Sequence, residues 1–253
     1  MGEALISRVA SWAAVRKQLV EVQKSNWNAP AYSRWINRPL GRIFAATGYK
    51  LGVSPNMITA ISACFTFPGI LLLASCRPSW PIGVVISALL VVGYALDSAD
   101  GQVARLRGGG TPAGEWLDHV IDSVKMGSLH IAVAIMWFHD QREWPVWTVL
   151  IPLLFQVVAS VSFFSMILTD LIERESGAKV NRIALQRGER PSVLMSLIGI
   201  PADYGFMALS FALLGWFTGW RWLYVALFVF NVLLLAVLLV RWYRRVAAGP
   251  QGG

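Results

Sequence analysis

The chain has 253 residues, of which 56% are hydrophobic and only 14% are charged. With a mean hydropathy of +0.55, this composition excludes an ordinary soluble domain and indicates a membrane protein. The formal net charge of +8 does not indicate nucleic acid as a partner, because Lys and Arg lie at the ends of apolar runs and form no continuous basic patch. We therefore expect contact with membrane lipids and no nucleic-acid partner.

The N-terminal part of the chain precedes the long apolar runs. Residues 1–30 mix charges with short apolar groups, which predicts a helical or partly disordered cytoplasmic leader. In the following stretch, 31–48, Arg34, Arg38 and Arg42 are spaced four apart, with apolar residues largely on other faces. This pattern predicts an amphipathic juxtamembrane helix in the interface, its arginines toward anionic head groups. The alternative is a basic stretch that only orients the protein.

Six apolar runs follow, each long enough for a hydrocarbon core that requires about 20 residues of helix. Pro55 can begin the first of them, with Ser54 or Asn56 serving its first turn. The expected helices cover approximately 55–76, 80–105, 114–138, 144–168, 198–217 and 222–240. The predicted fold class is an all-α integral membrane protein with six transmembrane helices preceded by an N-terminal amphipathic interfacial helix. We expect a single domain over 31–245 and a disordered tail over 246–253.

The distribution of positive charge predicts the orientation. Of the 22 Lys and Arg, three lie in the turns on one side (Arg77, Arg142 and Arg221), Lys125 lies within a membrane helix, and the other 18 lie on the opposite side or in the termini. Cytoplasmic loops carry an excess of positive charge. We therefore expect both termini, and the linker between the second and third helices, on the cytoplasmic side of a cell or inner membrane.

Residues 96–122, LDSADGQVARLRGGGTPAGEWLDHVID, carry aspartates where the surrounding sequence indicates membrane. Ionisable residues inside a membrane are retained mainly where they face a polar cavity, a partner or a metal. A helix turns about 100° per residue, so Asp97 and Asp100 lie about 60° apart, and Asp118 and Asp122 about 40° apart. If the glycine turn at 108–110 makes the two helices neighbours, all four carboxylates can converge on one pocket.

This pocket has the composition of a phosphoryl-transfer site. Two divalent cations would cancel the four formal charges, and an all-oxygen ligand set favours Mg²⁺ or Mn²⁺ over zinc. Gly101 and Ala104 add little bulk beside the carboxylates, so phosphates can approach the backbone. Arg105 is placed to bind a phosphate oxygen, and Thr111 is a polar group in the turn. Metals and an arginine around a pyrophosphate indicate phosphoryl transfer.

The spacing Asp97-x2-Asp100-Gly101-x2-Ala104-Arg105-x8-Gly114-x3-Asp118-x3-Asp122 resembles the signature of the CDP-alcohol phosphotransferases (class-I CDP-alcohol phosphatidyltransferases) at every fixed position. With Pro55-Asn56-x2-Thr59 and the number of helices, the resemblance covers roughly residues 50–240. It implies an integral membrane enzyme of phospholipid synthesis. Such an enzyme cleaves the pyrophosphate of a CDP-linked substrate, transfers the phospho-substituent to an alcohol and releases CMP.

The resemblance also assigns roles to residues. It implies that Asp97, Asp100 and Asp118 are metal ligands, and that Asp122 is both a ligand and the base that takes the proton of the acceptor hydroxyl. Contacts with the CDP portion are implied for Pro55, Asn56, Thr59, Gly101, Ala104, Arg105 and Thr111. For Asn56, Thr59 and Thr111 the alternative is a helix cap. A homodimer is also expected from the family.

Residues on the acceptor side are less clearly marked. Lys125 lies about 20° from the face of Asp118 but deeper, and either holds an anionic acceptor or pairs with Asp122. The basic loop with Arg182, Arg187 and Arg190 either selects a phosphate-bearing acceptor or only supplies positive-inside charge. His119 is expected either to contact the metal ligands without binding the metal itself or to have a structural role. His130, deep in an apolar helix, is expected to be packed and hydrogen-bonded.

Three hypotheses follow for the whole chain. In the leading one, CDP-diacylglycerol enters from the bilayer and a polar alcohol arrives from the cytosol. In the second, a soluble CDP-alcohol is the donor and a lipid alcohol the acceptor; it is favoured only by a local resemblance around Asp118 and His119 to the choline and ethanolamine branch. In the third, the protein is a non-catalytic transporter, which could also keep intramembrane carboxylates but would release no CMP.

Overall fold

The computed structural model describes residues 11–21, 29–140, 144–177 and 193–248, and the regular structure within them is entirely helical. The predicted all-α class is therefore confirmed for these residues. The N-terminal elements are α2 (Trp12–Glu21), the π-helix η1 (Ser33–Asn37) and α3 (Arg38–Lys50). Four long helices follow: α4 (Pro55–Ser75), α5 (Trp80–Leu106), α6 (Pro112–His139) and, after the short η2 (Val146–Val149), α7 (Leu150–Glu175). The C-terminal part contains α9 (Val193–Ile198), η3 (Ile200–Ala202), α10 (Tyr204–Ser210), η4 (Phe211–Trp216) and α11 (Phe217–Ala247).

Five helical runs among the described residues are long and apolar enough to cross a membrane. They cover Pro55–Ser75, Trp80–Leu106, Pro112–His139, Val146–Glu175 and Tyr204–Ala247. The first three agree with the predicted helices to within two residues, and the fourth continues seven residues beyond its predicted end. The fifth contains most of the last two predicted helices, so the count of six is not confirmed and stays a prediction.

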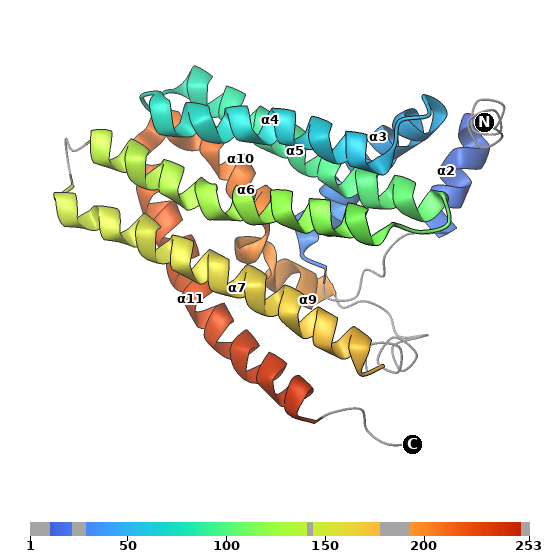
Figure 1. The fold of residues 1–253 in the computed structure, drawn as a ribbon. Coiled ribbons are helices and arrows are strands. Elements are labelled where there is room, and N and C mark those ends of the chain that lie inside the picture. Colours follow the sequence, from blue (N-terminus) through green and yellow to red (C-terminus); the bar gives the residue numbers. More distant parts are fainter. Residues whose placement is uncertain (1–10, 22–28, 141–143, 178–192, 249–253) are drawn as a thin grey trace.

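The run from Tyr204 to Ala247 is not one straight helix. Figure 1 shows the chain turning back after α10, so that α11 runs in the opposite direction. The backbone leaves helical geometry at Trp216, with φ −106° and ψ 67°. Across the bend, the indole N–H of Trp220 donates to the Ser210 hydroxyl at 3.2 Å. The bend lies next to the break that the sequence predicted between 217 and 222, where Thr218, Gly219 and Arg221 interrupt the apolar residues.

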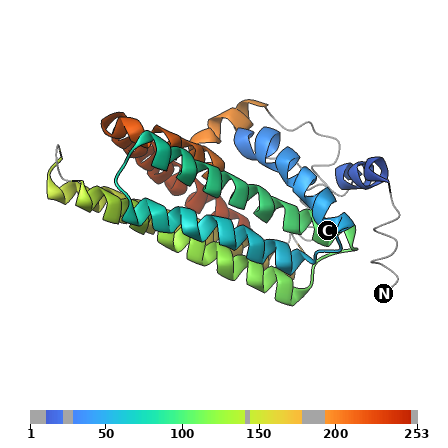
Figure 2. The same cartoon turned by 90° about the horizontal axis from the view of Figure 1, so that it is seen from above.

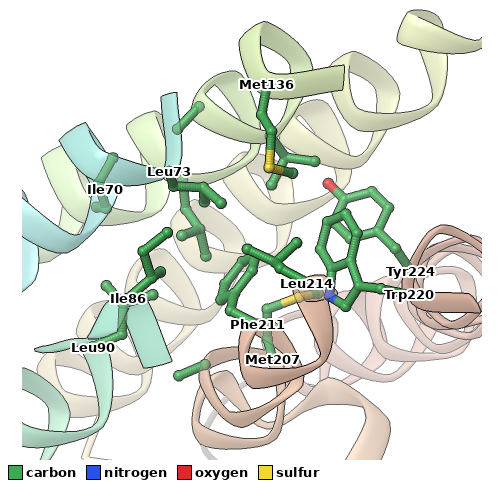
Figure 3. Close-up of a cluster of buried hydrophobic side chains, with 14 of the residues drawn as sticks. Ile70, Leu73, Ile86, Leu90, Met136, Met207, Phe211, Leu214, Trp220 and Tyr224 are labelled. Carbon is green, nitrogen blue, oxygen red and sulfur yellow. The ribbon is translucent and has the colours of Figure 1, made fainter. Parts of the chain in front are cut away.

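The long helices pack as a bundle in which α4 contacts both α5 and α6, and α7 contacts α6 and α11. A buried apolar cluster joins them in one half of the bundle, shown in Figure 3. Nearer the aspartates, Gly93 of α5 lies against α4, where its carbonyl accepts a hydrogen bond from Ser62 at 2.8 Å. Small residues allow such close helix approach in membranes, where van der Waals packing drives association. The α4–α5 contact thereby fixes the helix that carries Asp97 and Asp100.

A helical run that ends at Lys50 covers the stretch of the predicted juxtamembrane helix, and its amphipathic character stays a prediction. Its small residues Gly41 and Ala45 are buried, and α3 packs along the end of α5 (Figure 2). The arginines do not all point outward as expected: Arg34 donates to the Ser196 hydroxyl at 3.3 Å, and Arg38 is half-buried. The small residues of α3 allow this helix to pack closely on α5, so its arginines do not all face away from the protein. Its position in the membrane interface stays a prediction.

Part of the predicted leader is also docked. Val15 and Leu19 of α2 are fully buried in a small cluster with Ala45, Ile58 and Val103. Of the leader, 1–10 and 22–28 lie outside the described residues, as do 249–253 of the predicted tail. The division into leader, domain and tail stays a prediction.

Candidate active site

A short turn brings the two aspartate-bearing helices together. After α5 ends at Leu106, Gly108 and Gly109 have φ of +90° and +130°, a backbone region that glycine adopts without strain. The amide of Gly109 donates to the carbonyl of Ala104 at 3.0 Å. Thr111 then caps α6, its hydroxyl accepting from the amide of Gly114 at 3.1 Å. The predicted glycine turn is confirmed, and Thr111 caps α6, while its contact with CDP stays a prediction.

Three carboxylates meet at this end of the bundle. Asp97, Asp100 and Asp118 each offer an oxygen, and these oxygens all lie within 4.8 Å of one another. Asp100 is the most buried, at 5% exposed, and it accepts the hydroxyl of Thr59 at 2.6 Å. It also accepts the amide of Gly101 at 2.5 Å. The convergence predicted for these three aspartates is therefore present, and α4 supplies a donor that orients one of them.

Asp122 joins the cluster through a lysine. The ammonium of Lys125 lies 2.5 Å from a carboxylate oxygen of Asp122 and 3.1 Å from one of Asp97. Lys125 is 5% exposed, and burying a charge is costly unless it is paired. The pairing of Lys125 with Asp122, one of the two sequence-based alternatives, is confirmed. Lys125 further links α6 to α5, which the i, i+3 spacing alone did not predict.

The donor set fits a divalent cation. It consists of carboxylate oxygens converging from two helices, the ligands that Mg²⁺ and Mn²⁺ prefer. One of the three carboxylates is already oriented by neighbouring N–H and O–H groups, as ligating carboxylates commonly are. Asp97, Asp100 and Asp118 would therefore hold such an ion without rearrangement of the fold. Two ions, and the choice between Mg²⁺ and Mn²⁺, stay predictions.

The residues predicted to contact CDP lie at the start of α4, near the end of α5 and in the turn before α6. A Cβ added at Gly101 would meet only the guanidinium of Arg105, at 3.3 Å, so Gly101 exposes its backbone beside that cation. A Cβ at Gly114 would lie 3.0 Å from the amide oxygen of Asn56 and 3.2 Å from the hydroxyl of Thr111. Gly114 is thus required for the close approach of α4 to the start of α6. Asn56 and Thr111 therefore meet at Gly114, where the start of α4 packs against the start of α6.

The remaining predicted CDP contacts have defined places. Pro55 is the first residue of α4, whose cap is Ser54, accepting from the amide of Met57 at 3.2 Å. The side chain of Asn56 is therefore not the cap. Ala104 lies in the last turn of α5, its Cβ 4.0 Å from the Cβ position at Gly110. The Thr59 hydroxyl is not a cap either, since it donates to Asp100 and to the carbonyl of Pro55.

The two histidines have different surroundings. The imidazole of His119 lies 3.8 Å from Glu115, which also pairs with Arg174 at 2.5 Å. This exposed network ties α6 to α7. His130 hydrogen-bonds to the hydroxyl of Tyr224 at 2.6 Å and is buried, which confirms the packed, hydrogen-bonded role expected for it. A supporting role of His119 behind the metal ligands stays a prediction, and Arg182, Arg187 and Arg190 lie outside the described residues.

Sequence reasoning missed groups that arrive from distant elements. Arg38 of α3 lies close enough to Arg105 for the two cations to repel, and burial lowers the pKa of Arg38 below its ordinary value. Its backbone carbonyl accepts from Gln102 at 3.4 Å, which sets α3 against α5. The only sequence signal was the four-residue spacing of the arginines, which was interpreted as head-group contact.

A hollow of about 230 Å³ lies between α6 and α7. Ser123, which follows Asp122, lines it together with Gly127 and the aromatic rings of Phe163 and Phe164. A Cβ added at Gly127 would meet no atom within 4 Å. The glycine therefore leaves space between the two helices.

Comparison with known proteins identifies the class to which this site belongs. A family model described as CDP-alcohol phosphatidyltransferase matches residues 52–213. The match covers well over half of the chain and includes all four aspartates, the turn and the start of α4. The chain belongs to the CDP-alcohol phosphatidyltransferase family.

Two curated proteins are similar over this region. The phosphatidylinositol phosphate synthase of Corynebacterium glutamicum is 32% identical over 159 residues, which are 60% of this chain and 64% of that protein. The archaetidylinositol phosphate synthase of Pyrococcus horikoshii is 33% identical over 100 residues, 40% of this chain and 50% of that protein. The chain thus spans less than two thirds of the length of each of these relatives.

One solved structure also matches the chain. It is the phosphatidylinositol phosphate synthase of Mycobacterium tuberculosis, crystallised with manganese and citrate. The TM-score is 0.47 at 17% identity, and the similarity covers 85% of this chain and 91% of that one.

Proposed function

We propose that the protein is a metal-dependent transferase of phospholipid synthesis, which cleaves CDP-diacylglycerol, transfers the phosphatidyl group to a polar alcohol and releases CMP. The observation that carries the proposal is the convergence of Asp97, Asp100 and Asp118 to within 4.8 Å in a chain of the CDP-alcohol phosphatidyltransferase family. The carboxylates lie at the end of a bundle of apolar helices. Such a site can bind a pyrophosphate while its lipid remains in the bilayer.

In this mechanism Asp122 takes the proton of the acceptor hydroxyl. The acceptor oxygen forms a bond to the β-phosphorus of the donor, and the bond from that phosphorus to the bridging oxygen breaks, so the electron pair leaves with CMP. The chemistry that a bound Mg²⁺ or Mn²⁺ supplies is neutralisation of charge on the pyrophosphate and the departing phosphate. Lys125 balances the charge of Asp97 and Asp122 in the absence of substrate, because it contacts both.

The nucleotide side is assigned to the groups around the turn. The open backbone at Gly101 lets a phosphate oxygen approach, and Arg105 provides a charge-assisted donor beside it. Asn56 and Thr111 offer polar side chains beside Gly114 for contacts with the nucleotide. Pro55 and Thr59 act mainly by shaping the start of α4, with Thr59 holding Asp100. The small side chain of Ala104 leaves room for the phosphates of the donor.

We propose an inositol phosphate as the acceptor, because the two curated relatives are named as synthases of inositol phosphate lipids. A phosphate-bearing acceptor requires cations near Asp122. Lys125 is one, and the loop with Arg182, Arg187 and Arg190 would supply others. The hollow beside Gly127 would accept an acyl chain of the donor.

For the membrane arrangement we propose six crossings, with residues 198–217, which include η3, α10 and η4, forming the fifth and α11 the sixth. The reversal after Trp216 (Figure 1) supports this count. With six crossings both termini lie on one side. The excess of Lys and Arg on the side of the aspartates favours the cytoplasm for that side. The homodimer expected from the family is part of the same proposal.

The test is to measure CMP release by the purified full-length protein in lipid nanodiscs with Mg²⁺ or Mn²⁺. CDP-diacylglycerol and a soluble CDP-alcohol serve as donors. Each is offered with inositol phosphate, glycerol phosphate, inositol and a diacylglycerol as acceptors. We expect CMP from CDP-diacylglycerol with inositol phosphate. Asp122→Asn should reduce the rate by about 10²- to 10⁴-fold, the usual contribution of a general base.

Asp170→Asn serves as the matched control, because Asp170 pairs with Arg174 at 2.9 Å and is not one of the carboxylates that converge with Asp97. Its rate should remain near that of the unmodified protein. CMP released only from the soluble donor with diacylglycerol would show the reverse polarity. No CMP from any pair would refute the transferase assignment.

A further inference from the structure

Tyr204 presents a buried hydroxyl to the acidic cluster without a hydrogen-bond partner. It is the first residue of α10, and its hydroxyl oxygen is inaccessible to solvent and unpaired. The ammonium of Lys125 lies 5.5 Å from the centre of its ring. The phenol is also close enough to Asp97 and Asp122 to interact with them electrostatically.

The ring of Tyr204 is held in place from several sides. Asp203, 3% exposed, caps α10 by accepting from the amide of Gly205 at 2.9 Å, and also accepts the amide of Ser33 at 2.8 Å. The ring of Tyr94 meets that of Tyr204 edge-on, with centroids 5.0 Å apart. These contacts join η1, α5 and α10 at the site. Tyr204 therefore cannot turn away without disrupting them.

An unpaired hydroxyl in this position calls for a ligand. Buried polar groups in native proteins are hydrogen-bonded in the large majority of cases, and two nearby tyrosines, Tyr94 and Tyr224, follow this rule. Tyr94 pairs with the Ser33 hydroxyl at 2.8 Å, and Tyr224 with His130 at 2.6 Å. Tyr32 also has an unpaired hydroxyl, but its acidic neighbour is Asp203 and not the metal-ligating cluster. Tyr204 differs from Tyr32 because its unpaired hydroxyl interacts with Asp122, the proposed base.

We propose that the Tyr204 hydroxyl donates a hydrogen bond to an oxygen of the polar acceptor, beside Lys125, and so positions the acceptor for Asp122. This inference rests on the proposed transferase function. The ligand class is an alcohol or phosphoalcohol with several oxygens, since one hydroxyl must face Asp122 while another oxygen accepts from Tyr204. In the proposed function, the CDP-linked donor is assigned instead to the groups near Gly101 and Arg105.

The test compares Tyr204→Phe with Tyr32→Phe, each of which removes one buried unpaired hydroxyl from the same aromatic group. CMP release in nanodiscs is measured while inositol phosphate is varied at saturating CDP-diacylglycerol, and then with the two roles exchanged. For Tyr204→Phe we expect the KM for inositol phosphate to rise about tenfold, equivalent to about 1.4 kcal/mol. The KM for CDP-diacylglycerol should stay within about twofold. Tyr32→Phe should change neither.

Two further measurements separate positioning from packing. Thermal unfolding of Tyr204→Phe should occur at the same temperature as in the unmodified protein or above it, because an unpaired buried polar atom is removed. Calorimetric titration with inositol phosphate alone should show about tenfold weaker binding for Tyr204→Phe. Equal KM and binding in the two tyrosine variants would overturn the inference. Failure of the unmodified protein to release CMP would instead refute the proposed function, and the inference with it.

Discussion

The hydrogen bond from Thr59 to Asp100 provides the sharpest test of the site. Thr59→Val keeps the shape of the side chain but removes the donor that lies 2.6 Å from the carboxylate. Both residues are almost fully buried, at 3% and 5% exposed, so water cannot easily replace the lost bond. Among the described residues, the amide of Gly101 is then the one remaining hydrogen-bond donor to Asp100.

The expected magnitude follows from the charge of the acceptor. Hydrogen bonds to charged groups contribute about 1.5–3 kcal/mol, and loss of a group that orients a metal ligand typically costs about 10- to 100-fold in metal affinity. We therefore expect the Mn²⁺ or Mg²⁺ concentration for half-maximal CMP release to rise by about 10- to 100-fold in Thr59→Val. Much of the rate should return at high metal concentration.

Thr66→Val is the matched control. Thr66 lies seven residues further along the same face of α4, is 2% exposed, and its hydroxyl has no hydrogen-bond partner. The same substitution there removes no donor to a carboxylate. If both variants require the same metal concentration as the unmodified protein, the reasoning about Asp100 is refuted.

Two further predictions concern space in the bundle. Gly127→Leu should fill the hollow between α6 and α7 and slow the reaction of long-chain CDP-diacylglycerol several-fold, while sparing a short-chain analogue; equal slowing of both would show that the hollow holds no acyl chain. A Cβ at Gly93 would overlap the Thr66 hydroxyl and lie 3.2 Å from the Thr66 amide, so Gly93→Ala should destabilise the protein by about 1–3 kcal/mol. Thermal unfolding of Gly93→Ala, with partial recovery expected in Gly93→Ala/Thr66→Ala, measures this effect. An unchanged unfolding temperature in Gly93→Ala would contradict the close packing of α4 on α5.

Features that depend on residues within a single helix were predicted correctly from the sequence. The ends of α4, α5 and α6 follow from apolar length, caps and glycines, and the faces of Asp97, Asp100 and Asp118 follow from helical periodicity. The expected helices 198–217 and 222–240 are separated close to the bend at Trp216, where Thr218, Gly219 and Arg221 interrupt the apolar residues. Hydropathy measures whether a residue suits a membrane and carries no information about the direction of the chain.

The sequence by itself determined the aspartate spacing, the glycine turn and the apolar helices, since each depends on residues close together in the chain. Only the tertiary structure decided that Thr59 orients Asp100, that Lys125 bridges Asp97 and Asp122, and that Tyr204 faces the same cluster. These contacts join α4, α5, α6 and α10. Which residues come into contact is set by how the helices pack. Helical periodicity gives the face of the helix on which a residue lies, but not the element that packs against that face.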